Sequence, residues 1–234
     1  DLGFRIEHTQ FTSGQIASKE VLEFDQSVGG DFIALLATAS YARDTRNKRV
    51  LPDAGSVTRL SGEIALPGGD ITYYKTELYH QQFVSLLDEF TLILEGEIGY
   101  GHGYGDTEKL PLTDNFFAGG IRSVRGFKSN TLGPRDSRNE PFGGNFKMVG
   151  SAEVVLPVPF LQDIKQFRLT GFFDVGSVFG DNQDFDVGDL RYSAGLGAIY
   201  LSPLGALTFS WGVPLKTKSG DETEPFQFTF GTSF

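Results

Sequence analysis

The sequence predicts an all-β fold, a transmembrane antiparallel β-barrel, and three observations lead to this prediction. Short segments of alternating apolar and polar residues recur along the 234-residue chain, separated by clusters of Gly, Pro, Asp and Asn. No segment approaches the roughly 18 to 20 uninterrupted apolar residues that a membrane-spanning helix needs. The last nine residues, 226–234, alternate aromatic with small or polar side chains and end on Phe234. We therefore expect tilted strands to cross the membrane.

Composition agrees with this fold class and excludes several others. The chain has 22 Phe, 8 Tyr, one Trp and 30 Gly, and its mean hydropathy of -0.16 is low for a helical membrane protein. The absence of cysteine excludes a disulfide framework and Cys-based metal sites. A net charge of -10 argues against nucleic-acid binding, which needs a basic surface. Asp1 begins no signal-peptide pattern, so we expect a processed or cut N-terminus.

About ten strands are predicted in chain order. In the segment 206–215, large apolar side chains starting at Leu207 face one way and small or polar ones starting at Ala206 face the other. Tyr192 and Tyr200, near the two ends of another segment, suit the two interfacial girdles. The strands are expected near residues 1–11, 31–43, 55–67, 71–85, 89–103, 145–157, 166–179, 190–202, 206–216 and 225–234.

Two segments break the strand pattern. Residues 16–24, Ile16 to Phe24, have apolar side chains spaced for a short amphipathic helix that caps a hairpin. Residues 106–145 are rich in Gly, Arg, Asn and Pro and are too long for an ordinary hairpin loop. A loop of this length usually has a function, so we look for a site within it.

The long loop contains the tetrapeptide Val124-Arg125-Gly126-Phe127. A guanidinium next to glycine can approach another backbone closely, and its planar fork of donors suits carboxylates. In the predicted phasing Glu153 and Asp174 face the lumen from neighbouring strands, so an inward-folded loop would place Arg125 between them. The alternative is a solvated arginine above carboxylates that face a water-filled lumen.

The final strand has two distinct faces. Phe226, Phe228, Phe230 and Phe234 share one face, which suits lipid, while Gln227 and Thr229 share the other. Gly231 is expected to mark a bend or bulge, because glycine tolerates unusual dihedral angles; the alternative is a simple packing gap.

The loop tetrapeptide and its glycine-rich flanks resemble the signature of the outer-membrane protein assembly factor superfamily, and within it they are most similar to the BamA family. Ser202-Pro203-Leu204-Gly205 and the terminal Phe-Gln-Phe fit the same family. The similarity is expected from about residue 31 to 234 and weakest in 1–30 and 135–142. It implies that 1–234 is the C-terminal portion of a 16-stranded barrel, without its first strands and POTRA domains.

The resemblance implies a function and a set of roles. The barrel would fold and insert β-barrel proteins into the outer membrane of a Gram-negative bacterium through a lateral gate. Residues 124–127 would be locked against Glu153 and Asp174, and the last strand with Gly231 would form one side of the gate. The implied partners are unfolded outer-membrane proteins, outer-membrane lipid or lipopolysaccharide, and accessory lipoproteins that bind the missing periplasmic domains.

Two other functions stay open at this point. One is a secretion pore of the same superfamily that exports a partner polypeptide, and the other is a barrel anchor for a fused enzyme domain. The chain itself is not expected to be an enzyme or to bind a cofactor or metal: His8, His80 and His102 lie in different segments, and no nucleophile elbow or phosphate loop is found. Glu95 and Glu97 share a strand face and are interpreted as lumen lining.

Ten strands of a larger barrel would leave two unpaired edges. We therefore expect either a smaller closed barrel or a sheet that belongs to a larger context.

Overall fold

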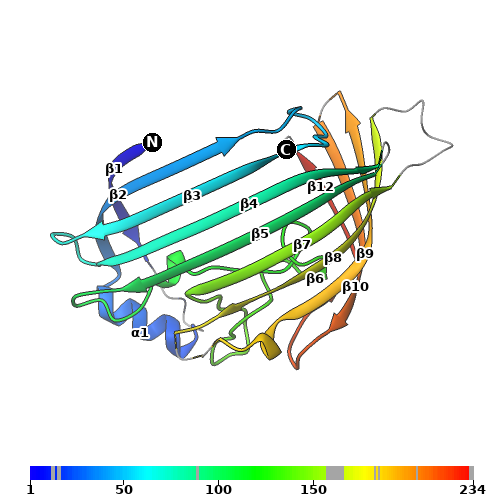
Figure 1. Cartoon of the computed structure of the whole chain (residues 1–234). Helices are drawn as coiled ribbons and strands as arrows, with labels where there is room; N and C mark the ends of the chain where they lie inside the picture. The colour runs from blue at the N-terminus through cyan, green and yellow to red at the C-terminus, as the bar shows by residue number, and fades with distance from the viewer. Residues whose placement is uncertain are drawn as a thin grey trace.

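The computed structural model describes residues 1–11, 14, 17–87, 90–156, 166–181, 183, 185–203 and 205–231. These residues form one ten-stranded antiparallel sheet in which neighbours in sequence are neighbours in space, with a two-stranded ribbon beside it. The sheet curls into a partial barrel that stays open between β1 and β12 in the part described (Figure 1). The strands of the sheet are β1 Leu2–Gln10, β2 Asp31–Asp44, β3 Gly55–Leu66, β4 Tyr73–Leu87, β5 Phe90–Gly103, β7 Phe146–Leu156, β8 Phe167–Phe179, β9 Arg191–Ser202, β10 Gly205–Lys216 and β12 Phe226–Gly231.

The ten predicted strands are confirmed, with ends that differ by a few residues. Nine of the ten contain nine to fifteen residues, enough for a tilted strand to cross a bilayer, and β12 is described over six. The last three residues of the predicted final strand, including Phe234, lie outside the described part. The smaller closed barrel is not what the described residues form, because β1 and β12 each pair with one neighbour only.

The two faces of the sheet have the predicted alternation. On β10 the side chains of Trp211, Val213 and Leu215 are at least half exposed on the convex side, while Ala206 and Ser210 are buried on the concave side. In the pairing of β10 with β9, residues that lie opposite each other face the same side of the sheet, so the alternation continues on the neighbouring strand. None of the helices among the described residues is long and apolar enough to span a membrane.

The connections differ in length between the two ends of the strands. At one end lie the segments 11–30, 67–72, 104–145, 180–190 and 217–225, which are longer on average. At the other end the connections are 45–54, 88–89, 157–166 and 203–204. Barrels of the outer membrane have short periplasmic turns and longer extracellular loops, so the first end is the extracellular one.

The helix between β1 and β2 lies later in the chain than predicted. α1 spans Lys19–Val28 because the Ser18 side chain caps its N-terminus by accepting from the Val21 N–H, and Gly29 ends it with a φ of 74°. The predicted start at Ile16 lies outside the described residues. The prediction weighed apolar spacing and ignored these two cap residues, which explains the shift.

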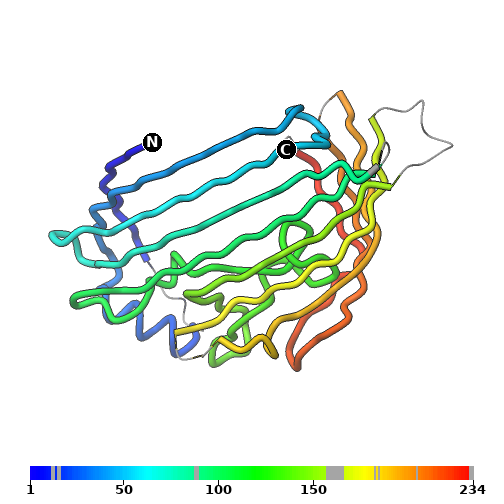
Figure 2. The backbone as a smooth tube through the Cα atoms, viewed as in Figure 1, coloured from blue at the N-terminus to red at the C-terminus, as the bar shows by residue number. Residues whose placement is uncertain are grey.

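The buried core lies inside the curve of the sheet, between the wall and the segments that fill it. The 104–145 loop runs along the concave face, and α1 lies below the extracellular ends of the first strands (Figure 2). Phe127, Val124 and Leu132 of the loop are fully buried against wall residues such as Val149 and Val178. The loop is therefore a packed part of the structure, which fixes the position of its tetrapeptide.

Candidate functional site: the loop tetrapeptide and the barrel wall

The long loop enters the lumen as a compact, internally bonded segment. It contains the short 3-10 helix Leu112–Asp114 and the strand β6, Gly126–Phe127, and an isolated bridge joins Ala118 to Leu132. β6 pairs with β11, Thr223–Glu224, from the connection between β10 and β12. The tetrapeptide is thus held by a neighbouring loop as well as by the wall.

Arg125 contacts both predicted carboxylates. Its guanidinium donates to Asp174 through Nε and Nη2, each at 2.7 Å, and to Glu153 Oε2 through Nη1 at 2.5 Å. Its backbone N–H also donates to Asp174 Oδ2, at 3.0 Å. Such a fork of charge-assisted hydrogen bonds fixes the plane of the guanidinium as well as its distance from the wall.

Burial makes these contacts stronger than a surface ion pair. The Asp174 side chain is 0% exposed and the Arg125 side chain 12% exposed, so little water competes for their hydrogen bonds. Burial of the guanidinium lowers the pKa of Arg125, but the hydrogen bonds and charges of Asp174 and Glu153 outweigh burial and raise it. Arg125 therefore stays protonated at any physiological pH.

Two further wall residues, which the sequence pattern did not single out, complete the cluster. Ser151 accepts from Arg125 Nη2 at 3.0 Å and donates to Asp174 Oδ1 at 2.7 Å. The ring of Phe172 lies under the guanidinium, with its centroid 3.5 Å from Arg125 Cζ, which is a cation–π contact. Ser151 pairs with Asp174 across β7 and β8, and Phe172 pairs with Glu153. The alternation of the two strands could therefore have identified both residues as lumen-facing neighbours of the carboxylates.

Gly126 allows the loop to touch the wall with its backbone. Its φ is 86°, and a Cβ at this position would lie 2.9 Å from the carbonyl oxygen of Gly212 on β10. Any other residue would be strained and would push the two backbones apart. The glycine that follows Arg125 is therefore required by both its dihedral angle and its close contact.

Gln227 of β12 holds the tip of the loop. Its Nε2 donates to the Phe127 carbonyl at 2.7 Å, and its Oε1 accepts from the Gly126 N–H at 3.3 Å. The Gln227 side chain is buried, and these bonds satisfy polar groups of the loop backbone. This role was not predicted, because on the lumen face of the last strand Gln227 looks no different from Thr229 in the sequence.

A second ion-pair cluster joins the loop to the β10–β12 connection nearer the extracellular side. Glu222 accepts from Lys128 Nζ at 2.7 Å and from Arg135 Nη2 at 3.2 Å. Hydrogen bonds from Lys128 and Arg135 lower the pKa of Glu222. All three side chains are partly exposed to solvent, so this cluster is weaker than the one around Arg125.

The aromatic residues of the last strand lie apart from this cluster. Phe226, Phe228 and Phe230 are more than half exposed on the convex face of β12. Gly231 pairs with Ala206 in the same continuous register as the residues before it, and its φ is not positive. The described part of β12 ends at Gly231, so a bend or bulge there stays a prediction. A Cβ there would meet no atom within 4 Å, which fits the packing-gap alternative.

The remaining sequence candidates do not form a chemical site. Glu95 accepts from Tyr79 and Gln81 on the lumen face, and Glu97 pairs with Lys147. The described residues contain no group of three or more side chains that could hold a metal ion.

The sequence of the chain is similar to known proteins of one superfamily. The sequence model of the Omp85 superfamily domain matches residues 1–234. The outer membrane protein assembly factor BamA of Neisseria meningitidis serogroup B is 36% identical over 270 residues, covering 100% of this chain and 34% of the relative. A SAM50-like protein of Schizosaccharomyces pombe is 30% identical over 219 residues, covering 88% of this chain and 46% of the relative.

The backbone matches a solved member of the same family. The crystal structure of BamA from Haemophilus ducreyi lacking POTRA domains 1-3 superposes with a TM-score of 0.87 at 25% identity, covering 100% of this chain and 50% of that one. The chain thus spans half or less of the length of these relatives. The expectation that the likeness begins near residue 31 was too narrow, since the match includes residues 1–30. With its whole length matched by the family's sequence model and its backbone shared with a solved relative, the chain belongs to the Omp85 superfamily.

Proposed function

We propose that this chain is the membrane-spanning part of an assembly factor that folds β-barrel proteins and inserts them into the outer membrane. The observation that carries the proposal is the match of the whole chain to relatives named as assembly factors, together with a loop tetrapeptide fixed on the wall by Arg125. The bacterial BamA relatives and the apolar convex face of the strands support a location in the outer membrane of a Gram-negative bacterium.

Val124, Arg125, Gly126 and Phe127 act, in this proposal, as a lock that holds the loop inside the barrel. The support is the buried charge cluster that Arg125 forms with Glu153 and Asp174. A fixed loop keeps the lumen occupied while the wall changes shape. The lock requires no bound cofactor and no chemical step, and the named relatives are assembly factors, so we propose no enzymatic activity.

The lateral gate is proposed at β12. Among the described residues β12 pairs with β10, and the backbone donors and acceptors on its other edge meet no strand of this part of the chain. A strand of an unfolded outer-membrane protein would pair with this edge by β-augmentation. Phe226, Phe228 and Phe230 would face lipid beside the entering strand, and Gly231 would leave space where no side chain fills the lumen side.

Partners follow from the same proposal. Unfolded outer-membrane proteins are the substrates, outer-membrane lipid and lipopolysaccharide surround the convex face, and accessory lipoproteins bind periplasmic domains beyond this chain. The Neisseria meningitidis relative is named as an assembly factor, which does not favour the secretion pore or the barrel that anchors an enzyme.

The test is a charge swap in the intact parent protein, expressed while the wild-type copy is depleted. We expect Arg125→Glu to reduce the amount of folded outer-membrane barrels, and the double variant Arg125→Glu with Asp174→Arg to restore part of it. Arg122→Glu is the matched control, because Arg122 is an exposed arginine of the same loop. If the levels of folded barrels never change while one exported polypeptide is lost, the secretion pore replaces this proposal.

A further inference from the structure

One row of residues that crosses the convex face of the sheet combines polar side chains with glycines. The register pairs Arg43 of β2 with Thr58 of β3, Thr58 with His80 of β4, and His80 with Gly96 of β5. Gly96 in turn pairs with Gly150 of β7. Each of these residues lies on the same face of its strand as exposed apolar residues such as Leu60, Leu78 and Ile98, so the row faces lipid.

The first half of the row is polar. Arg43 is exposed, and the Thr58 hydroxyl lies 2.9 Å from His80 Nδ1, in hydrogen-bond contact. Charged and polar groups on the lipid face of a barrel cost free energy, with the cost largest at the middle of the bilayer. A polar partner from the membrane itself would offset this cost.

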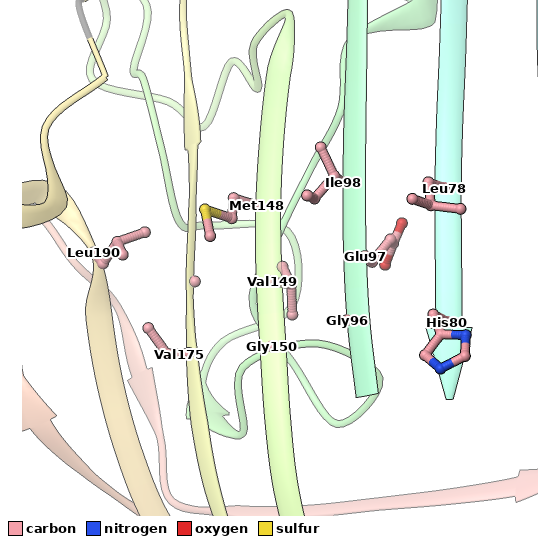
Figure 3. A pocket seen from close by; sticks show the side chains of 11 residues that line it. Leu78, His80, Gly96, Glu97, Ile98, Met148, Val149, Gly150, Val175 and Leu190 are labelled. Carbon is pink, nitrogen blue, oxygen red and sulfur yellow. The ribbon is translucent and has the colours of Figure 1, made fainter. Parts of the chain in front are cut away.

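The second half of the row is an apolar groove. A Cβ on Gly96 would meet no heavy atom within 4 Å, and the adjacent Gly150 likewise carries no side chain. The cavity there has a volume of about 330 Å³, and its lining residues include Leu78, Ile98, Met148 and Val175 (Figure 3). The groove begins beside His80, which lines it as well, so the polar and apolar halves are continuous.

The row also has a direction across the membrane. Arg43 is one residue from the periplasmic end of β2, whereas Gly150, the last residue of the row, lies near the middle of β7. The row therefore rises from the periplasmic boundary into the bilayer. Strands lie about 4.8 Å apart, so the four steps from Arg43 to Gly150 cover roughly 19 Å. The hydrocarbon core is about 30 Å thick, so one leaflet is about 15 Å thick. An acyl chain that is tilted within this leaflet is long enough to follow the row.

We propose that this row, Arg43–Thr58–His80–Gly96–Gly150, is a binding site for one phospholipid of the periplasmic leaflet. The lipid phosphate accepts hydrogen bonds from Arg43 and from the Thr58–His80 pair. One acyl chain lies in the groove over Gly96 and Gly150, alongside the neighbouring side chains of Ile98 and Met148. The site does not involve the loop, the lumen or β12.

The proposal can be tested by native mass spectrometry of the whole protein, titrated in detergent with dioleoylphosphatidylglycerol. Gly96→Leu fills the groove and should reduce the bound lipid. Gly171→Leu is the matched control, because Gly171 of β8 faces lipid elsewhere and its Cβ would also meet no atom within 4 Å. Heat-modifiable migration on a gel verifies that each variant is folded.

The polar half is tested separately. Arg43→Gln should weaken phosphatidylglycerol binding about tenfold, the factor expected when a hydrogen bond to a charged group is lost. Arg59→Gln, a lumen-facing substitution next to Thr58, should leave the affinity unchanged. Dioleoylglycerol, which has the same chains and no phosphate, should bind the wild type at least as weakly as phosphatidylglycerol binds Arg43→Gln. Equal loss in Gly96→Leu and Gly171→Leu, or equal binding of the two lipids to the wild type, would overturn the proposal.

Discussion

Gly126 and Gly212 lie backbone to backbone, one in the loop and the other in the barrel wall. A Cβ on Gly212 would lie 2.7 Å from the Gly126 nitrogen, just as a Cβ on Gly126 would lie 2.9 Å from the Gly212 carbonyl oxygen. Neither clash can be relieved by rotating a side chain, because both involve backbone atoms. The contact between loop and wall thus depends on two glycines that are far apart in sequence.

The first prediction concerns Gly212→Ala. The added methyl group should push the loop from the wall and lower the free energy of unfolding by about 1–3 kcal/mol, as overpacking does elsewhere. Urea titration of the folded protein in detergent measures this. Gly171→Ala should change the unfolding free energy much less, since a Cβ there meets nothing. Similar losses in both variants would contradict the role given to the Gly126–Gly212 contact.

The second prediction concerns the hydrogen bonds of Gln227. Gln227→Leu leaves the Gly126 N–H and the Phe127 carbonyl without their side-chain partner, which should cost about 1–3 kcal/mol because both groups are buried. Hydrogen exchange should become faster at the Gly126 amide. Thr229→Val, on the same lumen face of β12, serves as the control. An unchanged exchange rate at Gly126 would show that the contact contributes little.

The third prediction concerns Phe172 beneath Arg125. Phe172→Leu keeps an apolar side chain and removes the π face, so it should destabilise the loop contact by about 1–2 kcal/mol. Phe172→Tyr should retain most of the wild-type stability. Urea unfolding of the three proteins compares them, and a Leu variant as stable as the Tyr variant would rule out a cation–π contribution.

The fourth prediction concerns pH. Hydrogen bonds from Lys128 and Arg135 lower the pKa of Glu222 below its ordinary value of 4.5 in the folded state. The stabilising effect is therefore complete above that ordinary value and is lost as pH falls through the lowered pKa. Limited proteolysis of the 104–145 loop should accelerate in that acidic range. Glu222→Gln should remove this part of the pH dependence; a Gln variant that responds like the wild type would refute it.

Most of the fold could be read from the sequence because barrel strands have a strict two-residue period. The opposite exposure of Trp211 and Ser210 follows directly from that period. The cluster of Arg125 with Asp174 could be anticipated for a similar reason: a fork of donors needs carboxylates, and strand phasing limits which ones face the lumen. The first inference rests on a local pattern, whereas the inward fold of the loop came from the family resemblance, because the residues alone left a solvated Arg125 open.

The features that could not be predicted from the sequence depend on contacts between segments that are distant in the chain. Gln227 lies 101 residues from Gly126, and no local pattern distinguishes a lumen amide that binds a loop from one that faces water. The bend or bulge expected at Gly231 stays a prediction, because β12 keeps its register up to Gly231 and the described part of the strand ends there. The position of α1 could have been predicted from the sequence, because Ser18 and Gly29 are residue types that commonly begin and end a helix.

The bonds of Gln227 have a thermodynamic consequence. Gln227 belongs to β12 and binds the backbone of Gly126 and Phe127. Displacing β12 and releasing the loop tip therefore break the same two hydrogen bonds, so the free energies of the two events are coupled. By linkage, any molecule that binds the displaced strand loosens the loop by the same factor by which a loosened loop favours that binding. Arg125 and its buried carboxylates, which hold the same loop, would then contribute to the free energy needed to displace β12.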